Sequence, residues 1–461
     1  MRSIAALALG NAEGGGATTG TQPMPIKNAI GAEASFVMPL GRNITGCRSG
    51  LSPRVSVRKR VGMHRLLAPV ESVWLDAVRA VAAAHGFASV DAPARLGASV
   101  ARLSAVYNDP TRADLHSVDV ALLEARLGFS LVRDLPKVTT AVRELVDAGL
   151  LRLREKPLRV LDLGAGLGAS TLGLVRALAI AGESGTVDAV LVDDNKRALA
   201  LATDVARAIG KNIDIQLHVR TIVENAASYT GHDRFDVILL GQVVSELDNA
   251  LAPEARVQKH AAWITRLMQN SLADDGVLLV VEPALRDRTR HLHAVRDALM
   301  TAGSVTLFAP CLHHQACPML ANPHDWCHED LPVNLPDPLI PVARAAGLRF
   351  EGLTYSYLAL RRDGVTLRSR LESRAPGLGR VVSAPLVTKG KREWFLCGDA
   401  MTNGELGSGK IKAMRLDRER APHNLAWDDA NRGDILAFDP VLDKERPRLA
   451  KNGTVKRAGF V

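Results

Sequence analysis

Two small groups of residues in this sequence have types and spacing suited to chemistry. The first is a glycine-rich run, Asp162-Leu163-Gly164-Ala165-Gly166-Leu167-Gly168, which follows a short apolar segment. Glycines recur in such turns because they tolerate positive φ and let the main chain approach a ligand closely. The next apolar segment ends at Asp193, where a carboxylate can accept hydrogen bonds from ribose hydroxyls. Together these features indicate a nucleoside-binding site.

The turn alone leaves the kind of nucleoside open. Gly164, Gly166 and Ala169 also fit the dinucleotide fingerprint, and a purely structural glycine turn is a third alternative. Asp162, two residues before the first glycine, favours the D-x-G-x-G-x-G turn of proteins that use S-adenosyl-L-methionine. We therefore expect S-adenosyl-L-methionine rather than a nicotinamide cofactor.

The second group consists of cysteines in a stretch rich in His and Pro. Cys311, Cys317 and Cys327 lie close together in the sequence, and Cys397 follows in a later apolar segment. Soft ligands in a loop with little periodicity indicate a metal, either tetrahedral zinc or an iron–sulfur cluster. The spacing does not fit C-x₂-C zinc knuckles, and buried free cysteines are the remaining alternative. Cys47, far towards the N-terminus, is not expected to take part.

Alternating strands and helices are expected to position both groups. Apolar runs predict strands over residues 159–161, 187–192, 213–219, 235–240, 277–281 and 305–309. Residues 354–361 suit an antiparallel seventh strand. The pattern predicts an α/β fold with a doubly wound, seven-stranded class I methyltransferase (Rossmann-like) sheet.

Further segments flank this sheet or interrupt it. Residues 1–62 are basic and without periodicity, and we expect a disordered or targeting-like leader. Residues 63–156 predict a helical N-terminal domain that is broken at Leu135-Pro136. A methyltransferase-like domain then covers residues 157–363, with a Cys-rich insertion at 310–350 that is too long for a hairpin loop. Residues 364–461 predict a small, basic, β-rich C-terminal module.

Composition limits the partners that we expect. A net charge of +9 favours a polyanion, with nucleic acid first, although charge that only aids solubility is the alternative. Aromatic residues make up only 4%, so phosphate contacts should outweigh base stacking. No apolar run reaches the roughly 20 residues that span a bilayer, so we expect no membrane partner. The basic residues interleaved with the C-terminal strands are Arg415, Arg418, Arg420 and Arg432.

These pieces together resemble one family, the methyltransferase-like proteins of the mitochondrial small ribosomal subunit and their bacterial relatives. The resemblance covers about residues 65–440, and the cysteine set is its specific part. It is carried by residues 161–168, Ser245-Glu246-Leu247, Cys311, Cys317-Pro318, Trp326-Cys327-His328, Tyr355-Ser356-Tyr357-Leu358, Cys397-Gly398 and Arg432-Gly433-Asp434.

The resemblance implies a fold that binds S-adenosyl-L-methionine, a four-cysteine [4Fe–4S] cluster with zinc as the alternative, and binding to small-subunit rRNA during ribosome assembly. It implies a protein that is monomeric when free, in a bacterial cytoplasm or a mitochondrial matrix. The implied metal ligands are Cys311, Cys317, Cys327 and Cys397. The implied cofactor-binding residues are Asp162, Gly164, Gly166, Gly168, Asp193 and Gln242. In two departures from the family pattern, Leu312 precedes His313 and Glu329 follows His328, and neither removes a ligand.

Two functions compete for this chain. One is an assembly factor that retains the methyl donor but has lost the chemistry, and the other is an active rRNA methyltransferase with a structural Cys₄ zinc site. Residues 241–244 follow the fourth strand and lack the Asn/Asp-Pro-Pro-aromatic turn of amino-group methyltransferases, and no cysteine lies there for pyrimidine C5 chemistry. Gln242 and Glu246 are the nearest polar candidates, so the catalytic residues are unknown. A nicotinamide oxidoreductase is disfavoured by Asp162.

Overall fold

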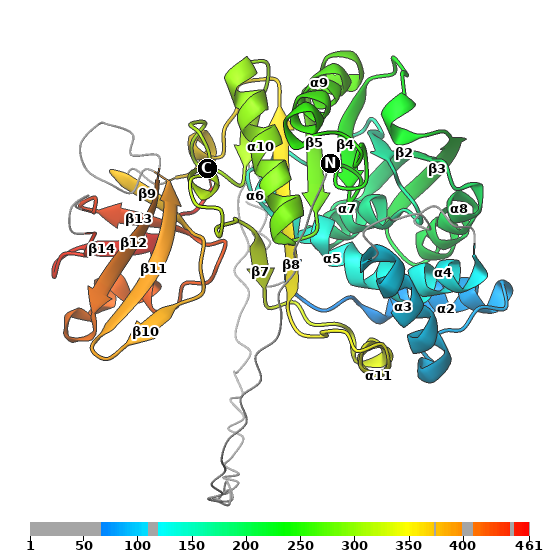
Figure 1. The fold of residues 1–461 in the computed structure, drawn as a ribbon, viewed down its shortest axis with the longest axis horizontal. Coiled ribbons are helices and arrows are strands. Elements are labelled where there is room, and N and C mark those ends of the chain that lie inside the picture. Colours follow the sequence, from blue (N-terminus) through cyan, green and yellow to red (C-terminus); the bar gives the residue numbers. More distant parts are fainter. Residues whose placement is uncertain (1–65, 109–118, 373–374, 399–408, 443–446, 461) are drawn as a thin grey trace, which may run out of the picture. The chain divides into compact units, whose positions relative to one another are not determined.

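The computed structural model describes residues 66–108, 119–372, 375–398, 409–442 and 447–460. The leader expected over residues 1–62, with Cys47, lies outside these ranges. Figure 1 shows a sheet with helices on both faces and a second sheet formed by the C-terminal strands. No helix of the described part is both long and apolar enough to cross a membrane.

The first sheet is mixed and mostly parallel. Its strands in spatial order are β3 (Ile215–Val223), β2 (Gly185–Asp193), β1 (Leu158–Leu163), β4 (Phe235–Gly241), β5 (Leu272–Glu282), β8 (Leu353–Arg361) and β6 (Thr306–Ala309). Strand β8 runs antiparallel to both β5 and β6. The predicted α/β fold is confirmed, and the antiparallel strand expected over residues 354–361 lies between β5 and β6.

An eighth strand joins this sheet, so the predicted number of seven is wrong by one. Strand β7 (Glu329–Leu331) pairs antiparallel with the first residues of β8, and Glu329 lies opposite Tyr355. Three residues are too few to show an alternation of period two in the sequence. This short strand begins two residues after Cys327, so it links the insertion to the sheet.

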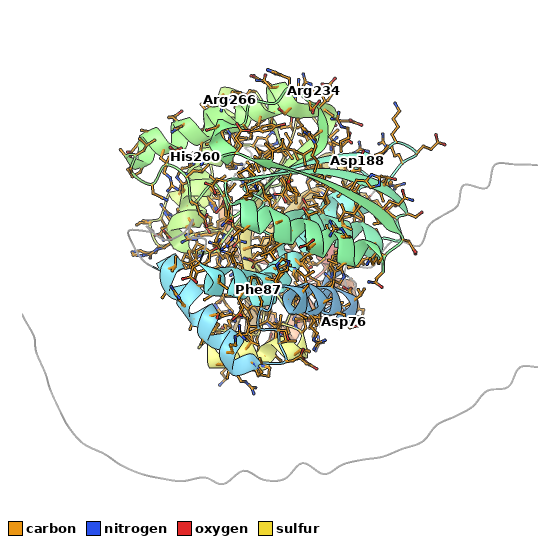
Figure 2. The ribbon with its side chains drawn as sticks, turned by 90° about the vertical axis from the view of Figure 1, so that its right-hand side faces the viewer. Asp76, Phe87, Asp188, Arg234, His260 and Arg266 are labelled. Atoms are coloured by element: carbon orange, nitrogen blue, oxygen red, sulfur yellow. The ribbon has the colours of Figure 1, made fainter. Side chains whose placement is uncertain are left out.

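Alternate residues of each strand face two different hydrophobic cores. In β1, Val160 belongs to the core on one face and Leu161 to the core on the other. The helices that cover the sheet are α7 (Ala169–Ile180), α8 (Lys196–Gly210), α9 (Pro253–Ser271) and α10 (Arg286–Ala302). Residues of α7 and α8 share a core with Val160, and residues of α9 and α10 share a core with Leu161. Figure 2 shows His260 and Arg266 of α9 on the opposite side of the sheet from Asp76.

A series of helices precedes β1 and covers the α7 side. They are α2 (Ser72–Ala84), α3 (Pro93–Asn108), α4 (Val120–Ala125), a π-helix (Arg126–Ser130), α5 (Leu131–Ala141) and α6 (Arg143–Asp147). The break predicted at Leu135-Pro136 is wrong, because α5 continues through Pro136. Helix α5 packs closely on α7: Thr139 Oγ1 donates to the Gly173 carbonyl at 2.9 Å, and a Cβ on Gly173 would lie 2.5 Å from the Leu135 carbonyl oxygen. Packing here outweighs the missing N–H of proline.

The insertion and the C-terminal strands complete the chain. The insertion contains two 3₁₀ turns (Pro318–Leu320 and Asp337–Leu339), β7 and α11 (Ile340–Ala345). The second sheet has the order β10 (Leu386–Thr388), β11 (Lys391–Gly398), β9 (Gly377–Val381), β13 (Ile435–Asp439) and β14 (Thr454–Arg457), with β12 (Gly409–Leu416) paired to β11. Trp394, Trp427 and Phe438 are buried in its core.

Candidate functional site

The glycine turn follows β1 and has the left-handed backbone that its composition predicts. Gly164, Gly166 and Gly168 have φ values of +70°, +52° and +79°. A Cβ on Gly164 would lie 2.6 Å from Val243 Cγ2, whereas a Cβ on Gly166 would meet nothing within 4 Å. Gly164 therefore permits close packing of the protein, and Gly166 faces open space that a ligand could fill.

Two carboxylates hold this turn in place. Buried Asp162 accepts hydrogen bonds from the main-chain N–H of Thr171 (3.1 Å) and from its hydroxyl (2.8 Å), and so ties β1 to α7. Burial raises the pKa of Asp162 to about 7. Asp193, at the end of β2, accepts from the N–H groups of Gly166 (2.8 Å) and Asn195 (2.9 Å). Asp193 thus lies directly against the turn, where its remaining lone pairs could accept from ribose hydroxyls.

Gln242, just after β4, has a strained backbone and a fixed side chain. Its φ is +62°, which is uncommon for a residue other than glycine and is concentrated at functional sites. Its amide donates to Asp134 Oδ2 at 2.9 Å and accepts from Lys137 Nζ at 3.0 Å. Lys137 and Asp134 also pair at 2.8 Å. Burial alone would raise the pKa of Asp134, but the charges of Lys137 and Arg133 hold it below its ordinary value, so this carboxylate is ionised.

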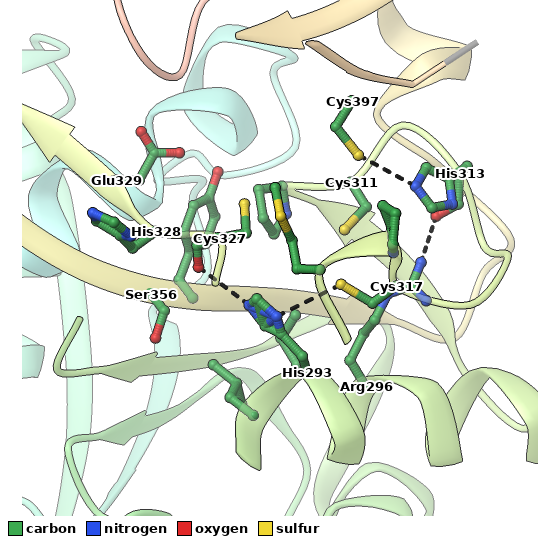
Figure 3. A pocket seen from close by; sticks show the side chains of 16 residues that line it. His293, Arg296, Cys311, His313, Cys317, Cys327, His328, Glu329, Ser356 and Cys397 are labelled. Carbon is green, nitrogen blue, oxygen red and sulfur yellow. Dashed lines mark hydrogen bonds between the residues drawn. The ribbon is translucent and has the colours of Figure 1, made fainter. Parts of the chain in front are cut away.

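The four predicted cysteines line one cavity (Figure 3). Cys311 follows β6, Cys317 precedes the first 3₁₀ turn of the insertion, Cys327 precedes β7, and Cys397 lies on β11. All four are free thiols and partly buried. The cavity has room for a group larger than a single water molecule.

Burial makes Cys317, Cys327 and Cys397 poor acids in the absence of a metal. It raises the pKa of Cys317 to about 12, and it also raises the pKa values of Cys327 and Cys397. Thiols with raised pKa values do not react as nucleophiles at neutral pH, whereas metal coordination removes their protons outright. No three His, Cys, Asp or Glu side chains of the described residues are arranged to hold a single metal ion.

Two histidines contact the sulfurs. His293 Nδ1 lies 3.6 Å from Cys317 Sγ, and His313 Nε2 lies 3.5 Å from Cys397 Sγ. Burial lowers the pKa of both histidines to about 4, so both rings are neutral at physiological pH. His293 Nε2 lies 3.1 Å from the Cys327 carbonyl oxygen and must donate to it, so Nδ1 is left as the acceptor for the Cys317 thiol.

One face of α10 holds the insertion against the sheet. Asp297 accepts from the Cys317 N–H at 2.9 Å, and Arg296 donates to the His313 carbonyl at 2.8 Å. Arg290 donates to four main-chain carbonyls, those of Met319 (2.9 Å), Leu320 (3.3 Å), Asn322 (2.7 Å) and Asp325 (2.8 Å). These charge-assisted hydrogen bonds organise the loop by protein contacts alone.

A buried group of four charged side chains lies behind the cavity. Arg380 pairs with Glu144 at 2.5 Å, and Arg143 pairs with Glu329 at 3.2 Å. Tyr357 donates to the second oxygen of Glu144 at 2.9 Å. Charges buried in this way are tolerated only when they are paired and hydrogen-bonded, and removing one partner leaves the other uncompensated.

This charged group is connected to three of the four cysteines. Arg380 is the cross-strand partner of Cys397 and donates to the Pro310 carbonyl, next to Cys311, at 2.6 Å. Glu329 lies two residues after Cys327. The glutamate at position 329, which departs from the family pattern, is thus explained by its pairing with Arg143.

A known protein family matches most of this chain. The family model described as mitochondrial small ribosomal subunit Rsm22 matches residues 131–430. The chain belongs to the Rsm22 family. The match spans well over half of the chain and includes α5, the glycine turn and all four cysteines of the cavity. No curated protein matches this chain.

Solved methyltransferases are similar to parts of this Rsm22-family chain. The plantazolicin methyltransferase BpumL in complex with SAH is 12% identical, with 58% of this chain and 96% of that chain covered and a TM-score of 0.31. A putative RNA methyltransferase from Pyrococcus horikoshii is 9% identical, with coverages of 50% and 82% and a TM-score of 0.27. NSun6 from Pyrococcus horikoshii with SFG is 15% identical, with coverages of 48% and 51% and a TM-score of 0.30. The family match, rather than these low scores, carries the assignment.

The basic residues expected in the C-terminal module are largely engaged within the protein. Arg415 is buried and pairs with Asp428 at 2.7 Å, so its expected place on a cationic face is wrong. Arg420 also pairs with Asp428, at 3.1 Å, and Arg432 donates to the His328 carbonyl at 3.2 Å. Asp428, which is close to these arginines in the sequence, is therefore the partner of two of them.

Several site residues could not be recognised in the sequence of this Rsm22-family protein. Asp134 and Lys137 flank the proline that had indicated a break, so their i, i+3 spacing on one helix was hidden. His293 and Arg380 lie in a helix and a strand without any motif. His313 offered a signal, because it stands two residues after Cys311 in a His-rich loop.

Proposed function

We propose that this protein binds S-adenosyl-L-methionine in the pocket beside the glycine turn and binds small-subunit rRNA during ribosome assembly, with a structural [4Fe–4S] cluster held by four cysteines. The single observation that carries the proposal is that Cys397, far along the sequence from Cys311, Cys317 and Cys327, lines one cavity with them within the Rsm22 match. In the proposed division, a leader (1–62), a helical domain (63–156) and a C-terminal module (364–461) flank the methyltransferase-like domain.

The residues around the turn fit the methyl donor. Open space before Gly166, the buried Asp162 Oδ1 without a partner among the described residues, and the carboxylate of Asp193 form a polar cradle. In the proposal Gly164, Gly166 and Gly168 supply main-chain contact, Asp193 orients the ribose, and Gln242 lies at the sulfonium side. Bound S-adenosyl-L-methionine supplies an electrophilic methyl group.

The four thiols fit an inorganic centre by the chemistry of the donor set. Cysteine thiolates are the ligands of cubane clusters and also of tetrahedral zinc. In the proposal the neutral His293 and His313 lie beside the sulfurs, and the apolar lining excludes water from the centre. The contacts of α10 position Cys317, and Arg380 positions Cys311 and Cys397.

Partners and compartment follow from family membership. The Rsm22 family is described as mitochondrial small ribosomal subunit, so we propose a matrix location if the source is eukaryotic and a cytoplasmic one if it is bacterial. We propose that the free protein is a monomer that binds rRNA through phosphate contacts, in keeping with its charge of +9.

One observation favours the alternative, an active rRNA methyltransferase with a structural Cys₄ zinc site. Gln242 has a strained backbone, and its amide is held by Asp134 and Lys137 beside the donor turn. Methyl transfer to an acceptor that is already nucleophilic depends mainly on positioning, so a fixed amide could suffice.

Two measurements test the proposal. Iron and acid-labile sulfide should be present in anaerobically purified protein, and stoichiometric zinc without sulfide would replace the cluster with the alternative centre. Transfer of a tritiated methyl group to small-subunit rRNA, lost in a Gly166→Trp variant, would contradict the pure assembly factor and establish the enzyme.

A further inference from the structure

A second cavity opens beside the donor pocket, and no function has been assigned to it. It lies between α5, the segment 333–336 and the first residues of β8. Strand β8 is antiparallel to β5, with Ser356 opposite Glu282, so its first residues lie at the carboxyl end of β5. This is the edge of a parallel sheet at which substrates bind.

Its lining combines cations with apolar surface. Arg133, Lys137 and Arg349 line the cavity, and none of its described lining residues is acidic. Pro136, Leu335 and Pro336 provide the apolar part of the lining, and Asn334 and Thr354 add polar groups. Arg133 and Arg349 are exposed, so their guanidinium groups are accessible to a ligand. Guanidinium groups bind phosphate in a bidentate manner. Because no carboxylate lines the cavity, none of its lining residues competes with a phosphate for these groups.

Lys137 separates this cavity from the donor pocket. It is only 8% exposed, and its ammonium group bonds to Gln242 and Asp134 on the donor side while its residue lines the second cavity. A group bound in the cavity would therefore lie directly across Lys137 from the place of the methyl donor.

Main-chain contacts hold the rim of the cavity. Asn334 Oδ1 accepts from the Gly352 N–H at 3.2 Å, and the Leu335 N–H donates to the Phe350 carbonyl at 3.1 Å. Gly352 has a φ of +71°, and a Cβ there would lie 2.7 Å from Arg349 Nη2. The glycine thus lets the arginine lie close to the rim.

We propose that this cavity binds one nucleotide of an RNA strand, with its phosphate on Arg133 and Arg349 and its base against Pro136 and Pro336. The proposal rests on the proposed RNA function and identifies the place where the acceptor strand meets the donor pocket. Asp134 and Asp330 do not cancel this charge: Asp134 is engaged by Lys137 and Gln242, and Asp330 lies 3.9 Å from Arg349 with both side chains largely exposed.

The test measures binding of a labelled single-stranded RNA of about ten nucleotides to the full chain over a series of salt concentrations. In an Arg133→Gln/Arg349→Gln variant we expect affinity to fall about tenfold. The slope of log K against log salt should decrease by about 1.4, because each phosphate contact on a single strand contributes about 0.7. An Arg266→Gln/Lys211→Gln variant, which loses the same charge from exposed positions of α9 and the end of α8, is the matched control and should bind like the parent.

The outcomes separate the two proposals. If the double variant keeps the parental affinity and slope while the parent binds RNA, the cavity is not the RNA site and the proposed function stands. If the parent binds no RNA, the proposed function fails and takes this inference with it. If adenosine monophosphate, added as a competitor, displaces the RNA from the parent but not from the double variant, the nucleotide site is supported. Equal weakening of both variants would mean that only total charge matters, and it would overturn the proposal.

Discussion

The turn after β1 and the cavity lined by four cysteines are stabilised over different distances along the chain. In the turn, Asp162 bonds to Thr171 and Asp193 to Gly166, so the contacts join neighbouring elements. Behind the cavity, Arg380 reaches Glu144 across 236 positions of the sequence. A site held by local contacts can form early, whereas one held by distant contacts requires the whole chain to be folded. The two regions should therefore respond separately to mutation.

The largest expected effect is on the metal centre, and it should distinguish the cavity of four cysteines from the turn after β1. In Cys317→Ser we expect nearly complete loss of iron and sulfide and loss of stability in the insertion and the C-terminal sheet together, because Cys397 belongs to both the cavity and β11. Metal analysis and hydrogen exchange check this. Cys47→Ser, which changes the one cysteine outside the cavity set, is the control and should retain the metal. Unchanged exchange in the C-terminal sheet would contradict the link.

The charged group behind the cavity gives the next effect. Arg380→Gln removes the closest cation from buried Glu144 and leaves it the Tyr357 hydroxyl and Arg143 at 3.8 Å, and we expect the free energy of unfolding to fall by about 3–5 kcal/mol. Binding of S-adenosylhomocysteine should survive under conditions where the variant is folded, because the donor turn does not use Arg380. Arg418→Gln, at an exposed arginine in the 3₁₀ turn Asp417–Glu419 after β12, should change little. If donor binding and metal are lost in parallel, the two regions are not independent.

The turn itself can be tested by two glycines that differ in what surrounds them. Gly164→Ala combines positive φ with a close contact to Val243, and we expect destabilisation by about 2–3 kcal/mol. Gly166→Ala has strain without a clash, so about 1 kcal/mol is expected. Calorimetric melting of both variants measures the difference, and their metal content should equal that of the parent. Equal destabilisation would show that the Val243 contact is unimportant.

The smallest effect concerns pH. Asp162 has a folded-state pKa of about 7, above its ordinary value of 3.8, because it is buried. The folded protein keeps this proton where the unfolded chain has lost it, so the contribution to stability is complete below about pH 4 and is lost as the pH rises to about 7. The slope is about 1.4 kcal/mol per pH unit. In Asp162→Asn the slope in urea-unfolding data should decrease by this amount, and Glu282, whose pKa is also about 7, contributes the same remaining slope in both proteins.

Much of the sheet could be predicted from the sequence, for a physical reason. Strands such as β1 and β4 are buried on both faces, so they appear as continuous apolar runs between polar turns. The acid at the end of β2 and the glycines after β1 are local features with local causes. Strand β7 was missed because its three residues pair only through tertiary structure, and the course of α5 was misread because packing on α7 tolerates Pro136.

The partners within each site were harder to predict. The cysteines could be grouped by type, but the pairing of Arg380 with Glu144 and of Arg143 with Glu329 depends on the final arrangement of distant segments. Similarly, the C-terminal arginines appeared to be free cations, and Asp428 engages two of them. Charge in a sequence indicates where ions are abundant, and only the fold decides which are neutralised.

The position of Cys397 on β11 has a consequence for synthesis of the chain. A nascent polypeptide has already emerged with the donor turn and three of the cysteines before the strand that carries the last one is translated. The wall of the cavity is therefore completed late, and a product truncated ahead of β11 can never complete it. Any inorganic centre assembled there would mark a polypeptide as translated at least through β11.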